Sequence, residues 1–125
     1  MAVTFAKGFV AAGVAAGIKK SGAKDVALLM VTHGSAVAAM VGTQNQVCAP
    51  SVTRNRGLVP GFVDGVVMNS GCANVATGPE GVANNEQMGT ALPEEILLTA
   101  STGVIGVQLP QAKLLAGIAA AHKAL

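Results

Sequence analysis

The sequence predicts an α/β domain. Three short apolar runs, at residues 26–32, 62–69 and 96–98, have the length of strands rather than of helices. Two later stretches carry helix-start signals, a Thr-Gly-Pro-Glu sequence at residues 77–80 and a proline at position 110. The chain of 125 residues is long enough for one domain, residues 1–125, with a hydrophobic core.

The composition indicates that a partner covers part of the surface. The chain is 51% hydrophobic and only 11% charged, so its surface must include large apolar patches. Its net charge of +2 comes from scattered Lys and Arg, and aromatic residues make up 2%. We therefore expect no nucleic-acid partner. The apolar stretches at residues 8–18 and 26–53 are interrupted by Gly or polar residues. We interpret them as buried segments of a cytoplasmic protein with no membrane partner.

The first elements are expected to be a glycine-rich packing segment and a hairpin. Glycines in residues 2–20 match no phosphate-binding loop and favour close backbone packing. Asp25 opens the run at residues 26–32, which we predict to be a strand buried on both faces. Residues 33–35 form a turn, and residues 36–41 return as a second strand.

The middle of the chain offers weak candidate sites. Arg54 and Arg56 lie in a predicted solvated loop or helix end, and an anion site there is the less favoured alternative. Cys48 and Cys72 are too few for a disulfide framework or a four-cysteine zinc site. We expect free thiols and no metal, and we consider cysteine catalysis improbable because no Cys/His arrangement is recognisable. His33 is expected to be a surface residue.

The third strand runs into a polar turn. Residues 62–69 are apolar, and residues 69–78 are rich in Asn, Ser and Gly. Small polar residues at strand ends are typical of sites in α/β folds. Thr77 is predicted to cap a helix from Gly78 to about Ala91 by a capping box.

The fourth strand ends in a second polar turn at residues 101–103. Its hydroxyls and backbone N–H groups could hold an oxygen that develops negative charge, although ordinary turn chemistry is favoured on this stretch alone. Pro110 begins the last helix. One apolar face of this helix is formed by Leu114, Ile118, Ala121 and Leu125.

Three blocks in order resemble the ornithine acetyltransferase family, the bifunctional glutamate N-acetyltransferases of arginine biosynthesis. The blocks are residues 3–22, the Asn-Ser-Gly-Cys-Ala-Asn-Val-Ala-Thr-Gly segment at 69–78, and the Ala-Ser-Thr-Gly-Val-Ile-Gly segment at 100–106 with Leu109, Pro110 and Lys113. They span nearly all of the chain.

The resemblance implies a layered α/β sandwich of the self-cleaving, N-terminal-Thr type, shared with DmpA-like aminopeptidases. This chain would be most of an α chain, and the nucleophilic Thr would begin a β chain that is absent from this sequence. The family moves acetyl from N-acetylornithine, and in some members from acetyl-CoA, to glutamate. The resemblance assigns the oxyanion hole to the Thr102 hydroxyl and the Gly103 N–H, without a cofactor, in an α2β2 assembly. The turn is then more plausibly functional than structural.

Two other functions stay open. A relative on the same scaffold could pass the acyl group to water, as an amidase or aminopeptidase. Alternatively, the chain could be a non-catalytic subunit that only completes a partner's fold.

Overall fold

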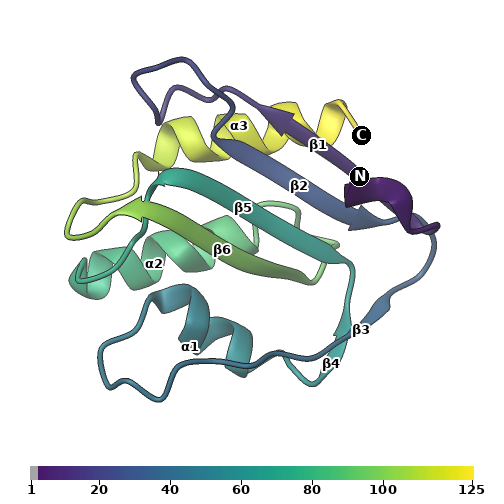
Figure 1. Ribbon diagram of the computed structural model, residues 1–125, viewed down its shortest axis with the longest axis horizontal. Helices are drawn as coiled ribbons and strands as arrows, with labels where there is room; N and C mark the ends of the chain where they lie inside the picture. Colours follow the sequence, from purple (N-terminus) through teal and green to yellow (C-terminus); the bar gives the residue numbers. More distant parts are fainter. Residues whose placement is uncertain (1–2) are drawn as a thin grey trace.

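A four-stranded mixed sheet forms the centre of the computed structural model, which describes residues 3–125 (Figure 1). Its order is β1-β2-β5-β6. The strands are β1 (Phe9–Val14), β2 (Val26–Val31), β5 (Gly65–Cys72) and β6 (Leu97–Val104). The pairs β1–β2 and β2–β5 are antiparallel, whereas β5 and β6 are parallel. Helix α2 (Gly78–Gly89) provides the crossover that a parallel pair requires.

Two helices cover one face of this sheet. In Figure 1, α2 and α3 (Gln111–Lys123) both lie behind the strands. The buried cluster joins alternate residues of β2 and the inner sides of the helices. Its members are Val26, Leu28, Met30, Val67, Cys72, Met88, Leu97, Leu109, Leu114, Ile118 and Ala121. The prediction that β2 is buried on both faces is wrong, because burial alternates along the strand. Leu125 lies beyond α3 and is 40% exposed, so it does not belong to the apolar face of that helix.

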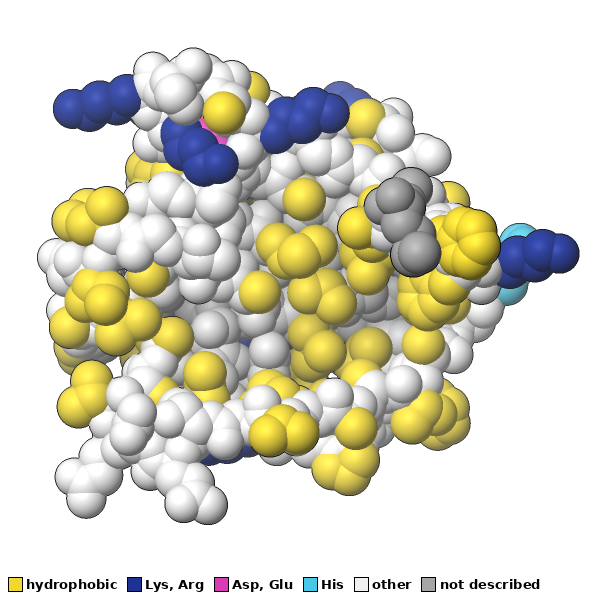
Figure 2. Space-filling view, viewed as in Figure 1, with side chains coloured by type: hydrophobic (Ala, Val, Ile, Leu, Met, Phe, Trp, Pro, Cys, Tyr) yellow, Lys and Arg dark blue, Asp and Glu magenta, His cyan; other side chains and the backbone are white. Residues whose placement is uncertain are grey.

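The opposite face of the sheet is open. Figure 2, seen from this side, shows apolar side chains gathered in a hollow over the central strands. The sequence-based expectation of apolar surface patches is thereby confirmed. Large apolar side chains that are exposed elsewhere include Phe5, Val37, Phe62, Val104, Ile105 and Val107. That a partner covers them stays a prediction.

The predicted hairpin of residues 26–32 and 36–41 does not form. The second segment contributes only β3 (Ala36–Ala38), which pairs with β4 (Gly61–Val63) in a separate two-stranded sheet. The partners of β2 are β1 and β5 instead. Most residues after the turn, up to position 47, are exposed, so the stretch 26–53 is not a buried segment as a whole.

Asp64 divides the predicted strand at residues 62–69. Its carboxylate accepts the Ile96 amide at 2.7 Å and the Ser35 hydroxyl at 2.6 Å. These two hydrogen bonds, the backbone one first, hold the pKa of Asp64 below its ordinary value of 3.8. The chain therefore leaves the β3–β4 sheet at Asp64 and enters the central sheet at β5.

The glycine-rich N-terminal segment contains the edge strand β1, which the sequence did not predict. A short 3-10 helix, η1 (Val3–Phe5), precedes it, and most of the strand is only half-buried rather than buried. Residue 2 of the predicted packing segment lies outside the described residues. The stretch expected to be a solvated loop or helix end forms a seven-residue helix, α1 (Pro50–Arg56). Within residues 3–125, no helix has the length and apolar character to cross a membrane.

Candidate functional site

The parallel pair of β5 and β6 brings the two polar segments of the sequence together. In its register Asn69 lies opposite Ser101, and Ser70 opposite Thr102. The prediction that residues 101–103 form the turn after the strand is wrong, because β6 continues to Val104. Residues 69–72 likewise belong to β5 and not to a turn. Both polar segments are thus the last residues of neighbouring strands, at one edge of the sheet.

Thr102 is exposed on the open face of the sheet. It lines a hollow of about 330 Å³ together with Ser70, Met68, Ala27 and Lys24. No hydrogen bond to the Thr102 side chain is found among residues 3–125, so its hydroxyl is free to donate to a ligand. Ser101 has the opposite orientation and meets the Met88 sulfur of α2 at 3.9 Å.

Only glycine fits at position 103. Its φ of +129° is in the region that L-amino acids rarely adopt. A Cβ atom would lie 2.4 Å from the carbonyl carbon of Gly71 and 2.6 Å from the nitrogen of Cys72. Gly103 is exposed, so another molecule can reach its backbone from the side away from β5.

Helix α1 supplies hydrogen bonds along part of the outer edge of β6. The Asn55 Nδ2 donates to the Thr99 carbonyl at 2.9 Å, and the Thr99 amide donates to Asn55 Oδ1 at 3.0 Å. Arg54 Nη1 donates to the Leu97 carbonyl at 2.5 Å. At Thr99, the Asn55 side chain therefore makes the two backbone hydrogen bonds that a fifth strand would make.

The same edge is open further along. Backbone groups of alternate residues in a strand have the same direction. Because Thr99 directs its N–H and C=O away from β5, Gly103, four residues later, directs its N–H to the same side. The free hydroxyl of Thr102 and the next amide in the chain are thus two neighbouring donors at one exposed point. No signal in the sequence indicated the part played by Asn55.

A buried polar turn fixes the chain after β5. Asn74 is 1% exposed and has a φ of +51°. Its Nδ2 donates to the Gly81 carbonyl, and its Oδ1 accepts the Thr77 hydroxyl, both at 2.8 Å. The predicted capping box is wrong, because the Thr77 side chain makes no capping hydrogen bond to α2. Helix α2 starts at Gly78 as predicted but ends at Gly89 rather than at Ala91.

Asp25 is buried beside the hollow and stabilises the segment before β2. Its carboxylate accepts the Ala16 amide at 2.6 Å and the Lys19 amide at 2.8 Å. Burial acts to raise the pKa of Asp25, but these backbone hydrogen bonds, one from Ile18 and the charge of Lys19 together lower it. The Asp25 carbonyl in turn accepts the Ser70 amide at 2.8 Å, which ties this segment to the site.

The other candidate residues lie elsewhere. Cys48 and Cys72 are both free thiols, and Cys72 is buried. Cys72 donates to the Val107 carbonyl at 3.1 Å. His33 is exposed, as expected. Arg54 and Arg56 are engaged separately, because Arg56 donates to the Thr43 carbonyl, so the two do not form a common anion site. Within residues 3–125, no three potential metal-binding side chains gather.

Comparison with known proteins gives consistent relatives. A model of the ArgJ family matches residues 10–125. The arginine biosynthesis bifunctional protein ArgJ of Streptomyces coelicolor is 45% identical over 97% of this chain and 33% of its own length. The protein of the same name from Deinococcus radiodurans is 43% identical over 93% of this chain and 32% of its own. The chain thus spans about a third of the length of these curated relatives.

Solved structures agree with this similarity. The crystal structure of ornithine acetyltransferase complexed with ornithine from Mycobacterium tuberculosis has a TM-score of 0.85 and 43% identity. It is matched over 95% of this chain and 68% of that one. An ArgJ protein from Bacillus halodurans has a TM-score of 0.84 and 34% identity, over 94% of this chain and 65% of that one.

Proposed function

The chain belongs to the ArgJ family, and on that premise we propose that it forms part of an acyltransferase that moves acetyl from N-acetylornithine to glutamate. In this proposal Thr102 and Gly103 form the oxyanion hole. The nucleophile is the N-terminal Thr of a β chain made from the same precursor, as the family resemblance implies. Acetyl-CoA is a possible second donor, and an α2β2 assembly is the proposed oligomer.

The reaction has two acyl-transfer steps. The Thr hydroxyl of the β chain attacks the acetyl carbonyl of N-acetylornithine, and the α-amine of that Thr takes the proton. The carbonyl oxygen becomes an oxyanion, which accepts hydrogen bonds from the Thr102 hydroxyl and the Gly103 N–H. The C–N bond then breaks and ornithine leaves with a proton. The amine of glutamate attacks the acetyl-Thr ester in the same way and releases N-acetylglutamate.

One observation carries the proposal: the structure presents two free, adjacent donors on a rigid strand end. Thr102 and Gly103 lie at an open edge in register with Ser70 and Gly71. Donors that are fixed before the charge develops need no reorganisation during the reaction, which is the basis of oxyanion stabilisation. Asn55 and the parallel partner β5 supply that rigidity.

The variant Thr102→Ala in the complete enzyme tests the proposal. We expect turnover to fall by about 10²–10³ because one oxyanion donor is lost. Ser101→Ala is the matched control, since it removes the neighbouring hydroxyl on the other face of the same strand. The assay measures N-acetylglutamate formed from N-acetylornithine and glutamate. Unchanged turnover in Thr102→Ala would contradict the role of Thr102, and acetate release without glutamate would indicate a hydrolase.

A further inference from the structure

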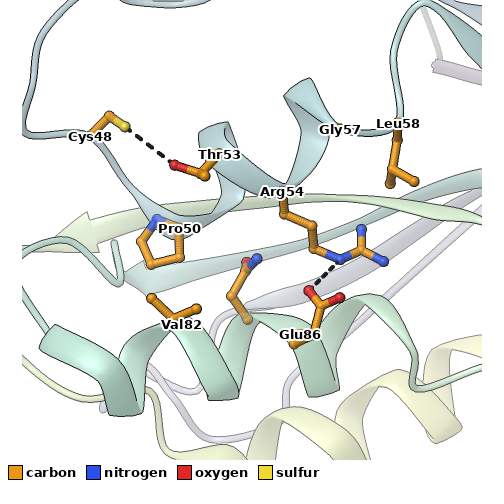
Figure 3. Close-up of a pocket in the computed structure, with 9 residues that line it drawn as sticks. Cys48, Pro50, Thr53, Arg54, Gly57, Leu58, Val82 and Glu86 are labelled. Atoms are coloured by element: carbon orange, nitrogen blue, oxygen red, sulfur yellow. Dashed lines mark hydrogen bonds and ion pairs between the residues drawn. The ribbon is translucent and has the colours of Figure 1, made fainter.

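A second hollow lies between α1 and α2, away from Thr102. It has a volume of about 480 Å³, within the usual size range of small-molecule sites. Figure 3 shows its walls, with Pro50, Leu58 and Val82 as apolar side chains and Cys48, Thr53, Arg54 and Glu86 as polar ones. Asn85 and Gly57 complete the lining. We call this hollow the α1–α2 groove.

The charged residues of the α1–α2 groove neutralise each other. Glu86 Oε2 lies 2.9 Å from Arg54 Nε (Figure 3), and the Arg54 side chain is only 13% exposed. Its guanidinium lies against α2 at Gly89, where a Cβ atom would come within 2.2 Å of Arg54 Cζ. Arg54 is therefore held in place, while the Glu86 side chain is 60% exposed and has a second oxygen available.

Asn85 provides an unused hydrogen-bond acceptor. The residue is 1% exposed, yet its Oδ1 has no hydrogen-bond partner among residues 3–125. A buried polar atom without a partner destabilises the folded protein, and such groups usually have a water molecule, an ion or a ligand as partner. Because Asn85 lines the α1–α2 groove, a molecule in the groove can supply the missing donor.

Two acceptors of the α1–α2 groove are available to a ligand. Asn85 Oδ1 has no donor among the described residues, and the Glu86 carboxylate has one oxygen outside its ion pair with Arg54. We propose that the groove binds a small molecule with a primary ammonium group on a short apolar stem. The ammonium donates to Asn85 Oδ1 and Glu86, and the stem packs against Pro50, Leu58 and Val82.

Such a ligand would also regulate the site at Thr102, a step that rests on the proposed function. Arg54 lines the groove and donates to Leu97 of β6, and the next residue, Asn55, is bonded to Thr99. A ligand that moves α1 therefore moves the outer edge of the strand that carries Thr102 and Gly103. Coupling of this kind is reciprocal, so a ligand at Thr102 changes the affinity of the groove.

Binding is tested with n-butylammonium chloride on the complete protein by isothermal titration calorimetry, at constant ionic strength. We expect saturable binding and at least tenfold weaker binding of n-butanol, because a charged donor makes the stronger hydrogen bond. Asn85→Leu removes the acceptor at similar volume and should weaken binding about tenfold or more. Gln87→Leu, which removes an exposed amide from the same helix, is the matched control and should bind normally.

A second variant keeps the test valid if Asn85→Leu does not fold. Val82 is 58% exposed, so Val82→Trp can fill the α1–α2 groove with little cost and should abolish binding. In the unmodified protein, n-butylammonium should also slow alkylation of Cys48 by iodoacetamide. Non-saturable binding, equal binding of n-butanol, or full affinity in Asn85→Leu or Val82→Trp would overturn the site.

The regulatory step has its own readout. With the unmodified enzyme, n-butylammonium should change the rate of acetyl transfer at least twofold, and this change should be absent in Val82→Trp. Binding of n-butylammonium without an effect on acetyl transfer would overturn the coupling between the two sites. The proposed binding site in the α1–α2 groove would still stand. If the protein has no transferase activity, the proposed function fails, while calorimetry and alkylation still decide whether the groove binds the probe.

Discussion

The replacement of Asn55 by Ala should destabilise the protein far more than its half-buried position suggests. Asn55 makes two hydrogen bonds of 2.9 and 3.0 Å to the backbone of Thr99, which is 1% exposed. Asn55→Ala leaves one N–H and one C=O of the buried strand edge without partners. At about 1–3 kcal/mol for each unsatisfied group, the free energy of unfolding should fall by about 2–6 kcal/mol.

Two comparison variants locate the cause of this loss. Arg56→Ala, the adjacent exposed position on α1, should change the free energy of unfolding by less than about 0.5 kcal/mol. Asn55→Asp keeps an acceptor for the Thr99 amide but loses the donor to the Thr99 carbonyl, so it should fall between Asn55→Ala and the unmodified protein. The three are compared on the complete protein by urea unfolding, followed by far-UV circular dichroism.

The outcome that would refute this reasoning is equally specific. If Asn55→Ala and Arg56→Ala have the same free energy of unfolding within about 0.5 kcal/mol, the hydrogen bonds to Thr99 contribute nothing net. Water would then replace Asn55 at the edge of β6, and the rigidity that we assign to the end of this strand would need another source.

Three further predictions follow from buried or strained positions. Asp25→Asn should lower the free energy of unfolding at pH 7, and the difference from the unmodified protein should shrink as the pH falls below about 4. The reason is that the lowered pKa of Asp25 gives stability that is present above its unfolded pKa and lost on protonation. Unfolding measured at pH 7 and at pH 3 checks this. Gly103→Ala should cost about 1–3 kcal/mol or more, because its Cβ meets the backbone of Gly71 at a positive φ, and should reduce acetyl transfer; a normal melting temperature would contradict it. Met88→Ala leaves a cavity at a core position that is 0% exposed. It should lower the free energy of unfolding in urea by about 2–5 kcal/mol, and the residual specific activity of the variant is the control.

Local signals were sufficient for part of the fold. The apolar run at residues 26–32 and the Pro and Gly signals at positions 78–79 and 110 gave β2, α2 and α3 close to their observed bounds. The segment of β1 was missed because Gly and Ala are poor strand formers, and only its pairing with β2 makes it a strand. The hairpin was wrong for a similar reason, since β1 and β5 occupy the two edges of β2 and leave none for the segment that follows it.

The sequence indicated which residues form the candidate site but not how the strands place them. Polar residues at the ends of two apolar strands indicated a site, and Thr102 and Gly103 were named through the family resemblance. The sequence could not show that Ser70 and Thr102 are opposite each other. The register of the parallel pair depends on how helix α2, which connects β5 to β6, packs against the sheet. Nor could it show Asn55 against Thr99, a contact between residues 44 positions apart.

The donors of the candidate site and the strand opposite them belong to a single β5–α2–β6 unit, residues 65–104. The edge strand β1 lies at the other end of the sheet order, and the helix α3 supplies Leu114, Ile118 and Ala121 to the buried core. Natural variation at the two ends of the chain should therefore alter how much folded protein a cell accumulates. Variation within the unit, and in Asn55 which supports it, should instead alter the rate of acetyl transfer per folded molecule.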